Sequence, residues 1–123
     1  MKPRKRKVRS ASKKNNSQRG RATTARLDEL IEEATIDAYG ESEQTTGFFT
    51  ILEDHLALPF ETEVLGVLVT VERIEMTDDE QIVAVCARGK SRQRIPIVDL
   101  PIAVKPPEGS EWIDAYRRWA HGR

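Results

Sequence analysis

The chain has 123 residues, which is enough for one domain with a tail, and its 20 basic and 20 acidic residues give a formal net charge of zero. A single cysteine excludes an internal disulfide, and no apolar run approaches the roughly 18 residues of a membrane-spanning helix. The basic start is not followed by the apolar segment of a secretory signal, so we expect a cytoplasmic, monomeric protein without a membrane partner.

The charges are divided along the chain. Residues 2–26 hold eleven bases and no acid, residues 28–80 hold sixteen acids and one base, and residues 81–123 hold eight bases and four acids. The first 24 residues have too few apolar side chains to offset the entropy of ordering, which predicts a disordered basic tail over 1–24 and a single domain over 25–123. The tail's first cations, which either solubilise the protein or contact the phosphates of nucleic acid, are Lys2, Arg4, Lys5, Arg6, Lys7 and Arg9.

Two helices are predicted after the tail. Apolar residues at spacings of three and four indicate a helix over 25–38, capped by Thr23 or Thr24 and ended by Gly40. A second helix is expected over 42–55 and is stopped by Pro59. Gly47 lies inside that helix, where glycine costs about 1 kcal/mol relative to alanine.

Strands and one further helix follow. Residues 61–75 alternate as a strand with a bulge or sharp bend at Gly66, and residues 81–88 form an apolar strand that is buried on both faces or central. Residues 92–98 form a strand that Pro96 and Pro101 make an edge strand or end early. A last helix over 110–121, capped by Ser110, carries an aromatic stripe expected in the core: Trp112, Tyr116 and Trp119. The predicted fold is α+β, with two N-terminal helices, a small curled antiparallel sheet that is SH3-like or a partly open barrel, and a C-terminal helix.

The sequence contains no recognisable catalytic set. No nucleophile elbow, glycine-rich phosphate loop, zinc-binding cysteine pair or His-Glu-x-x-His motif occurs, so we expect no enzyme. Cys86 stands in an apolar strand, where a thiol is expected to be inert. His55 follows two acids, but one histidine is more typical of a helix end than of a transition-metal site.

Residues 37–60 gather five carboxylates and contain no Lys or Arg. Neighbouring carboxylates repel one another unless water solvates them or a cation binds among them. An EF-hand loop does not fit, because Tyr39, Ser42 and Phe48 would take its third, sixth and twelfth positions. The residues alone therefore leave both a solvated acidic face and a calcium site open for this set: Asp37, Glu41, Glu43, Glu53 and Asp54.

Three motifs in this region are similar to those of a known family. The stretches DAYGESEQ at 37–44, GFF at 47–49 and LEDHLALPF at 52–60 resemble the signature of a small family of bacterial calcium-binding proteins of the cyanobacterial heterocyst type. The resemblance extends over about residues 35–119 and includes EWIDAYRRW near the end. It implies an α+β fold and reversible calcium binding by surface carboxylates, which by position are the same five acids. The basic tail and basic C-terminal third depart from that strongly acidic family.

Two functions are therefore predicted. The first is non-catalytic calcium binding, for buffering or sequestration. The alternative is a nucleic-acid-associated module that uses the basic tail, although the acids of residues 28–80 would repel phosphate from the folded core. A link between the two is also expected, in which the tail folds onto the acidic middle and competes with calcium.

Overall fold

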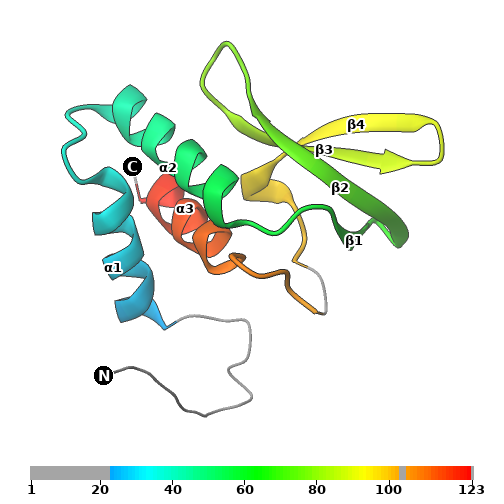
Figure 1. Cartoon of the computed structure of the whole chain (residues 1–123), viewed down its shortest axis with the longest axis horizontal. Helices are drawn as coiled ribbons and strands as arrows, with labels where there is room; N and C mark the ends of the chain where they lie inside the picture. The colour runs from blue at the N-terminus through cyan, green and yellow to red at the C-terminus, as the bar shows by residue number, and fades with distance from the viewer. Residues whose placement is uncertain (1–22, 103–104, 123) are drawn as a thin grey trace.

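The computed structural model of the chain describes residues 23–102 and 105–122. The elements in chain order are α1 (Thr24–Thr35), α2 (Glu41–His55), β1 (Phe60–Val64), β2 (Val67–Met76), β3 (Ile82–Arg88), β4 (Ser91–Pro96), the 3-10 helix η2 (Ile97–Asp99) and α3 (Glu111–His121). The three α-helices gather on one side and the sheet extends from the other (Figure 1). The predicted α+β class is confirmed. The tail predicted over 1–24 falls, up to residue 22, outside the described residues.

The sheet is an open antiparallel meander with the strand order β1-β2-β3-β4, so β1 and β4 are its edges. The prediction of one strand over 61–75 is wrong, because Leu65 and Gly66 separate two strands. Both residues have positive φ, 51° and 80°, as a two-residue type I′ hairpin turn requires. The bulge lies instead between Val71 and Arg73, where β2 shifts its register against β3.

The helix ends show which side chains act as caps. Thr23 Oγ1 accepts a hydrogen bond from Arg26 N at 3.1 Å, as expected for the start of α1. The end of α1 comes three residues earlier than predicted, and Asp37, with φ of 63°, takes the left-handed conformation after it. Gly40 therefore ends no helix, since it is the N-cap residue of α2. Ser110 precedes α3 without making a side-chain cap hydrogen bond.

Gly47 marks the place where α1 and α2 touch. A Cβ atom added there would lie 2.4 Å from the carbonyl oxygen of Ala34 in α1. No side chain other than hydrogen fits at this distance, so the glycine that appears costly for helix propensity is what permits the close contact.

The core lies between the helices and the inner face of the sheet. Trp112 and Tyr116 are buried and Trp119 is partly buried, which confirms the predicted aromatic stripe. Phe48 of α2 packs against Tyr116 and Trp119, with ring centroids 5.4 and 5.2 Å apart. Other fully buried side chains, from the helices, the strands, η2 and the residue that follows η2, complete the core: Leu30, Leu52, Val71, Ile82, Ile97, Leu100 and Ile113. None of the described helices is long and apolar enough to cross a membrane.

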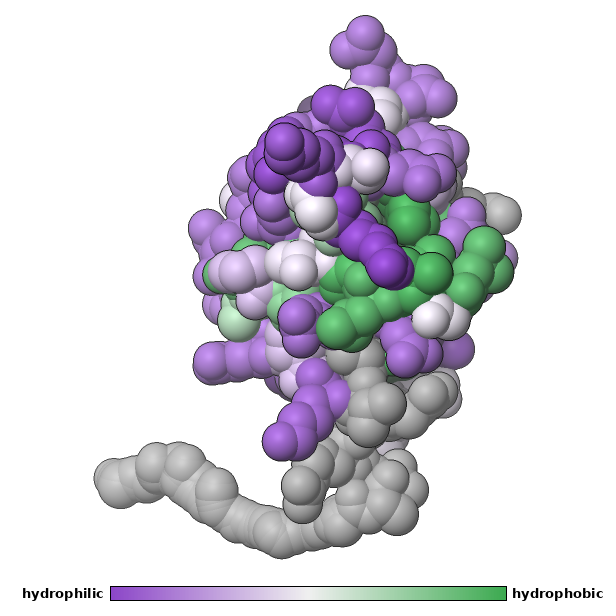
Figure 2. All heavy atoms as spheres, turned by 90° about the vertical axis from the view of Figure 1, so that its right-hand side faces the viewer, coloured by the Kyte–Doolittle hydropathy of each residue, from purple (hydrophilic) through white to green (hydrophobic). Residues whose placement is uncertain are grey.

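The end of the sheet farthest from the helices exposes apolar surface. Leu65, in the β1–β2 turn, is 98% exposed and Leu68 of β2 is 55% exposed. A groove of about 330 Å³ continues from this turn along the sheet between side chains of all four strands, among them Val64, Val69 and Ile95. Figure 2 looks toward this side of the molecule and shows a continuous green apolar area bordered by purple polar residues.

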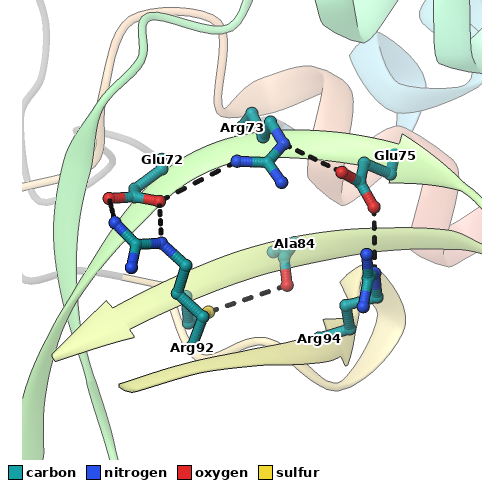
Figure 3. A network of polar contacts seen from close by, with 7 residues as sticks. Glu72, Arg73, Glu75, Ala84, Arg92 and Arg94 are labelled. Carbon is teal, nitrogen blue, oxygen red and sulfur yellow. Dashed lines mark hydrogen bonds and ion pairs between the residues drawn. The ribbon is translucent and has the colours of Figure 1, made fainter. Parts of the chain in front are cut away.

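The outer face of the sheet carries a ladder of ion pairs (Figure 3). Arg92 Nε and Nη2 donate to the two oxygens of Glu72 at 2.8 and 3.0 Å. Arg73 Nε and Arg94 Nε donate to the two oxygens of Glu75 at 2.8 and 2.9 Å. These side chains stand beside Val83, Val85 and Ala87, which are the outward-facing residues of β3 and are nevertheless buried. The aliphatic stems of the arginines thus cover apolar surface while their charged ends meet carboxylates.

Candidate functional site

Helix α2 separates the five predicted carboxylates into two groups. Glu41 and Glu43 are in its first turn with Asp37 just before it, whereas Glu53 and Asp54 are in its last turn. A rise of 1.5 Å per residue places the two ends of this helix about 20 Å apart. One ion cannot bind both groups, so the set falls into an N-terminal trio and a C-terminal pair.

The N-terminal trio has local structural roles. Glu43 Oε1 accepts a hydrogen bond from Tyr39 N at 2.8 Å, which closes the α1–α2 loop onto the first turn of α2. Glu41 and Glu43 also lie where the helix dipole favours negative charge. Asp37 is exposed on the loop, and Tyr39 beside it is 85% exposed.

The tertiary fold brings a second acidic segment to this end of α2. The β2–β3 turn carries Asp78, Asp79 and Glu80, and Ser42 Oγ donates a hydrogen bond to Glu80 Oε2 at 2.7 Å. The turn is held by the Thr77 hydroxyl, which donates to Asp79 and accepts from Gln81 N. Neither residues 36–46 nor residues 77–81 contain a Lys or Arg. The Ser42–Glu80 hydrogen bond thus joins two acidic segments that are distant in sequence, and the acids of the two segments are here named together the acidic junction (Asp37, Glu41, Glu43, Asp78, Asp79 and Glu80).

A groove of about 330 Å³ opens within the acidic junction. Its polar lining includes carboxylates of both segments, Glu41, Asp79 and Glu80, together with the side chain of Gln81. Its deeper wall is made by apolar and aromatic groups such as Ile82 and Tyr116. Carboxylate and amide oxygens at the mouth of a groove are the ligand types that calcium prefers.

The side chains are not gathered as they would be around a bound metal. Among the described residues, no three His, Cys, Asp or Glu side chains converge closely enough to hold an ion. Glu41, Asp79 and Glu80 are exposed, so a change of rotamer would not disturb the core, but it would move carboxylates that already accept hydrogen bonds, Asp79 from Thr77 and Glu80 from Ser42. Any ion bound here requires such side-chain movement.

The C-terminal pair lies on an open surface. Glu53 and Asp54 are exposed and form no ion pair with another described residue. The adjacent His55 ring stacks on Trp112 with centroids 5.7 Å apart, and its carbonyl oxygen faces Gly109. His55 therefore has packing contacts of the kind expected for a histidine at a helix end.

Cys86 is buried in β3 with its Sγ 3.8 Å from the carbonyl oxygen of Ala84. Burial raises the pKa of the Cys86 thiol, because the thiolate would lose its hydration there. A raised pKa reduces the thiolate population that nucleophilic chemistry needs. This agrees with the expectation of an inert thiol.

The sequence reasoning described residues 77–80 as a polar turn and did not include them in the site. Their contact with α2 depends on how the helices dock on the sheet, which residue spacing does not encode. The available signal was that this turn also holds three consecutive acids without a base.

Comparisons of the chain with protein-family models, with curated proteins and with solved structures found no match. The resemblance to bacterial calcium-binding proteins therefore stays a prediction made from the residues.

Proposed function

We propose that this protein binds calcium reversibly, without catalysing a reaction, at the acidic junction. The observation that carries the proposal is the direct bond between Ser42 and Glu80, which joins two acidic segments at one groove. Of the motifs that resemble calcium-binding proteins, DAYGESEQ at 37–44 lies at this end of α2, and LEDHLALPF at 52–60 lies at the other end. Glu41, Asp79 and Glu80 are the ligands we propose, because they line the groove together.

The charge balance supports a cation rather than an anion as the ligand. Six carboxylates of the acidic junction come from two segments without Lys or Arg. At an effective dielectric constant of 20, two unit charges about 4 Å apart interact with about 4 kcal/mol, so carboxylates turned into one groove repel unless a cation joins them. Calcium suits this arrangement better than magnesium, because it tolerates irregular coordination by mixed oxygen ligands and water.

The open arrangement also sets the expected strength of binding. Turning several exposed side chains inward costs rotamer entropy, which a preformed site has already lost on folding. We therefore expect weak binding, with a dissociation constant at the weak end of protein calcium sites, about 10⁻⁴–10⁻³ M. Such a site suits buffering at high calcium better than sensing at low calcium.

Calcium titration by isothermal calorimetry tests the proposal, using ionic strength near that of the cell to screen distant charges. The test variant is Glu41→Gln with Glu80→Gln, which removes one carboxylate from each segment. The matched control is Glu53→Gln with Asp54→Asn, which removes the same charge from the opposite end of α2.

We expect the Glu41→Gln, Glu80→Gln variant to bind calcium at least about tenfold more weakly than the wild type, a loss of about 1.4 kcal/mol. The control variant should bind within about twofold of the wild type. Absence of calcium binding by the wild-type protein, or equal weakening by both variants, contradicts the assignment of the site.

The basic residues at positions 2–9 support a second proposal, contact with nucleic-acid phosphates. These residues lie outside the described part, and the support is their charge alone. Binding of duplex DNA should fall steeply as salt rises, because each phosphate contact releases a counterion. Deletion of residues 1–22 should abolish it, and DNA binding that survives this deletion at low salt would rule the tail out.

A further inference from the structure

The two edge strands of the sheet carry opposite charges on the same face. The pairing registers of the sheet place Glu61 and Glu63 of β1, and Arg92 and Arg94 of β4, on its outer face. Among the described residues β1 pairs only with β2, and β4 pairs only with β3. An edge strand offers unpaired backbone groups to any strand that fits beside it.

The carboxylates of the acidic edge make no ion pair within the described residues. Glu61 and Glu63 are exposed and form no ion pair with another described residue. A groove of about 760 Å³ runs along this edge, between β1 and the segment that contains Pro101 and Ile102. Lys105 lines the same groove, and Thr62 Oγ1 donates to the carbonyl oxygen of Pro101 beside it. The β1 edge thus has carboxylates without an ion pair and open space beside it.

The basic edge has a surplus of donors. In the ladder of Figure 3, three arginines share the two carboxylates of Glu72 and Glu75. Arg94 uses only its Nε in the ladder and its side chain is 63% exposed. The inner face behind this strand is the apolar groove bounded by Gln93 and Ile95. A strand that fits beside β4 should carry acids on its outer face and apolar or small groups on its inner face.

We propose that β1 of a second copy of this chain pairs antiparallel with β4, so that the sheet continues from one molecule into the next. Strand β1 has the required pattern, since FETEV alternates acids with apolar or small residues. The pairing sets Glu63 opposite Arg92 and Glu61 opposite Arg94 on the outer face. On the inner face it sets Phe60 opposite Ile95 and Thr62 opposite Gln93. Pro59 and Pro96, which have no backbone N–H to donate, meet at one end of the pair.

The same charges disfavour the two symmetric dimers. Two antiparallel β4 strands centred on Gln93 would set Arg92 of each copy against Arg94 of the other. Two β1 strands centred on Thr62 would set Glu61 against Glu63 in the same way. Like charges directly opposite one another destabilise a strand pair. Of the pairings between edge strands, head-to-tail pairing of β4 with β1 is the one that the charges favour. Such pairing leads to rings or open chains rather than to closed two-fold dimers.

The direction of the strands agrees with this pairing. In a four-stranded meander with all neighbours antiparallel, β1 and β4 run in opposite directions. A second molecule in nearly the same orientation therefore presents a β1 strand that is antiparallel to β4, with its outer face on the same side. No turning over of the second molecule is needed.

Sedimentation velocity from micromolar to millimolar concentrations tests this proposal on the full chain. The wild-type protein should show mass that increases with concentration and decreases with added salt. Glu61→Lys with Glu63→Lys should sediment as a monomer. The control, Glu53→Lys with Asp54→Lys, changes the net charge equally and should associate like the wild type. A wild-type protein that stays monomeric at millimolar concentration, or a control that loses association as fully, overturns the proposal.

A charge exchange tests the specificity. Arg92→Glu with Arg94→Glu should also be monomeric, whereas its mixture with Glu61→Lys, Glu63→Lys should associate again because both edge pairs regain opposite charges. Circular dichroism establishes that each variant is folded. A mixture of folded variants that stays monomeric contradicts the pairing.

A disulfide test keeps the pairing falsifiable if the double glutamate variant does not fold. Glu63→Cys on one molecule and Arg92→Cys on another should cross-link under oxidising conditions, because residues directly opposite in antiparallel strands lie within disulfide range. Glu53→Cys mixed with Arg92→Cys is the control and should not cross-link. Equal cross-linking in the two mixtures overturns the proposed register.

Discussion

Ser42 Oγ donates a hydrogen bond to Glu80 Oε2 at 2.7 Å and so fastens the first turn of α2 to the β2–β3 turn, 38 residues further along the chain. This contact is exposed, but it sets the spacing between the two acidic segments of the acidic junction. The backbone of Glu80 has the left-handed conformation, with φ of 66°, which is unfavourable for residues other than glycine.

The first prediction concerns that conformation. Glu80→Ala and Glu80→Gly both remove the carboxylate that Ser42 contacts, but only alanine keeps the Cβ that disfavours positive φ. The glycine variant should be more stable than the alanine variant by about 1 kcal/mol. Urea unfolding of the two variants measures the difference. Equal stabilities would mean that the turn relaxes to another conformation.

The second prediction reverses the usual effect of replacing a helical glycine. Gly→Ala inside a helix normally stabilises by about 1 kcal/mol. Gly47→Ala should instead destabilise by about 1–3 kcal/mol, because its Cβ would lie 2.4 Å from Ala34 O and would push α1 away from α2. Thermal unfolding measures the change.

Thr50→Ala, at an exposed position of the same helix, serves as the control for this change and should be close to neutral. A Gly47→Ala variant that melts at or above the wild-type temperature would contradict the close contact between the helices.

The third prediction concerns pH and the ion-pair ladder. Hydrogen bonds from Arg94 and Arg73 hold the pKa of Glu75 below its ordinary value. Because the pKa is lower in the folded state, the ionised carboxylate stabilises the fold at pH values above the unfolded-state pKa, which is about 4.3. This stabilisation is lost as the pH falls through the folded-state pKa. Glu75→Gln should therefore lower the melting temperature at neutral pH and have much less effect well below pH 4.

Glu53→Gln makes the same chemical change outside the ladder and is the control. Melting curves of the wild type and both variants at neutral and acidic pH provide the comparison. A Glu75→Gln effect that does not depend on pH would show that the side chain acts through packing rather than through its charge.

The fourth prediction concerns the segment that follows η2. Thr62 is buried, and its Oγ1 donates to the carbonyl oxygen of Pro101 at 2.8 Å. Thr62→Val keeps the shape but leaves that oxygen without this donor, which should cost about 1–3 kcal/mol. Thr70→Val, on the outer face of β2, should cost less than about 0.5 kcal/mol. Urea unfolding distinguishes the two, and equal costs would contradict a structural role for the Thr62 hydrogen bond.

Local periodicity was a good guide to the helices and to the core. The aromatic stripe of Trp112, Tyr116 and Trp119 was predicted from spacings of three and four, because a helix places such residues on one face. The β1–β2 hairpin is not predicted because Leu65 is an unusual residue at positive φ, and Gly66 alone indicates only a bulge or a sharp bend. Turn geometry of this kind depends on the pairing of the flanking strands as well as on the turn residues.

The sequence by itself determined which carboxylates are close together along the chain. It also determined that residues 37–60 contain no Lys or Arg. The helix predicted over 42–55 also placed Glu53 and Asp54 at its C-terminal end, away from Glu41 and Glu43. Only the tertiary structure decided that Asp79 and Glu80 join Glu41. The physical reason is that distance along a helix follows from its fixed rise per residue, whereas contact between a helix and a distant turn follows from packing of the whole core. Charge that is contiguous in sequence is therefore divided in space, and charge that is distant in sequence is brought together.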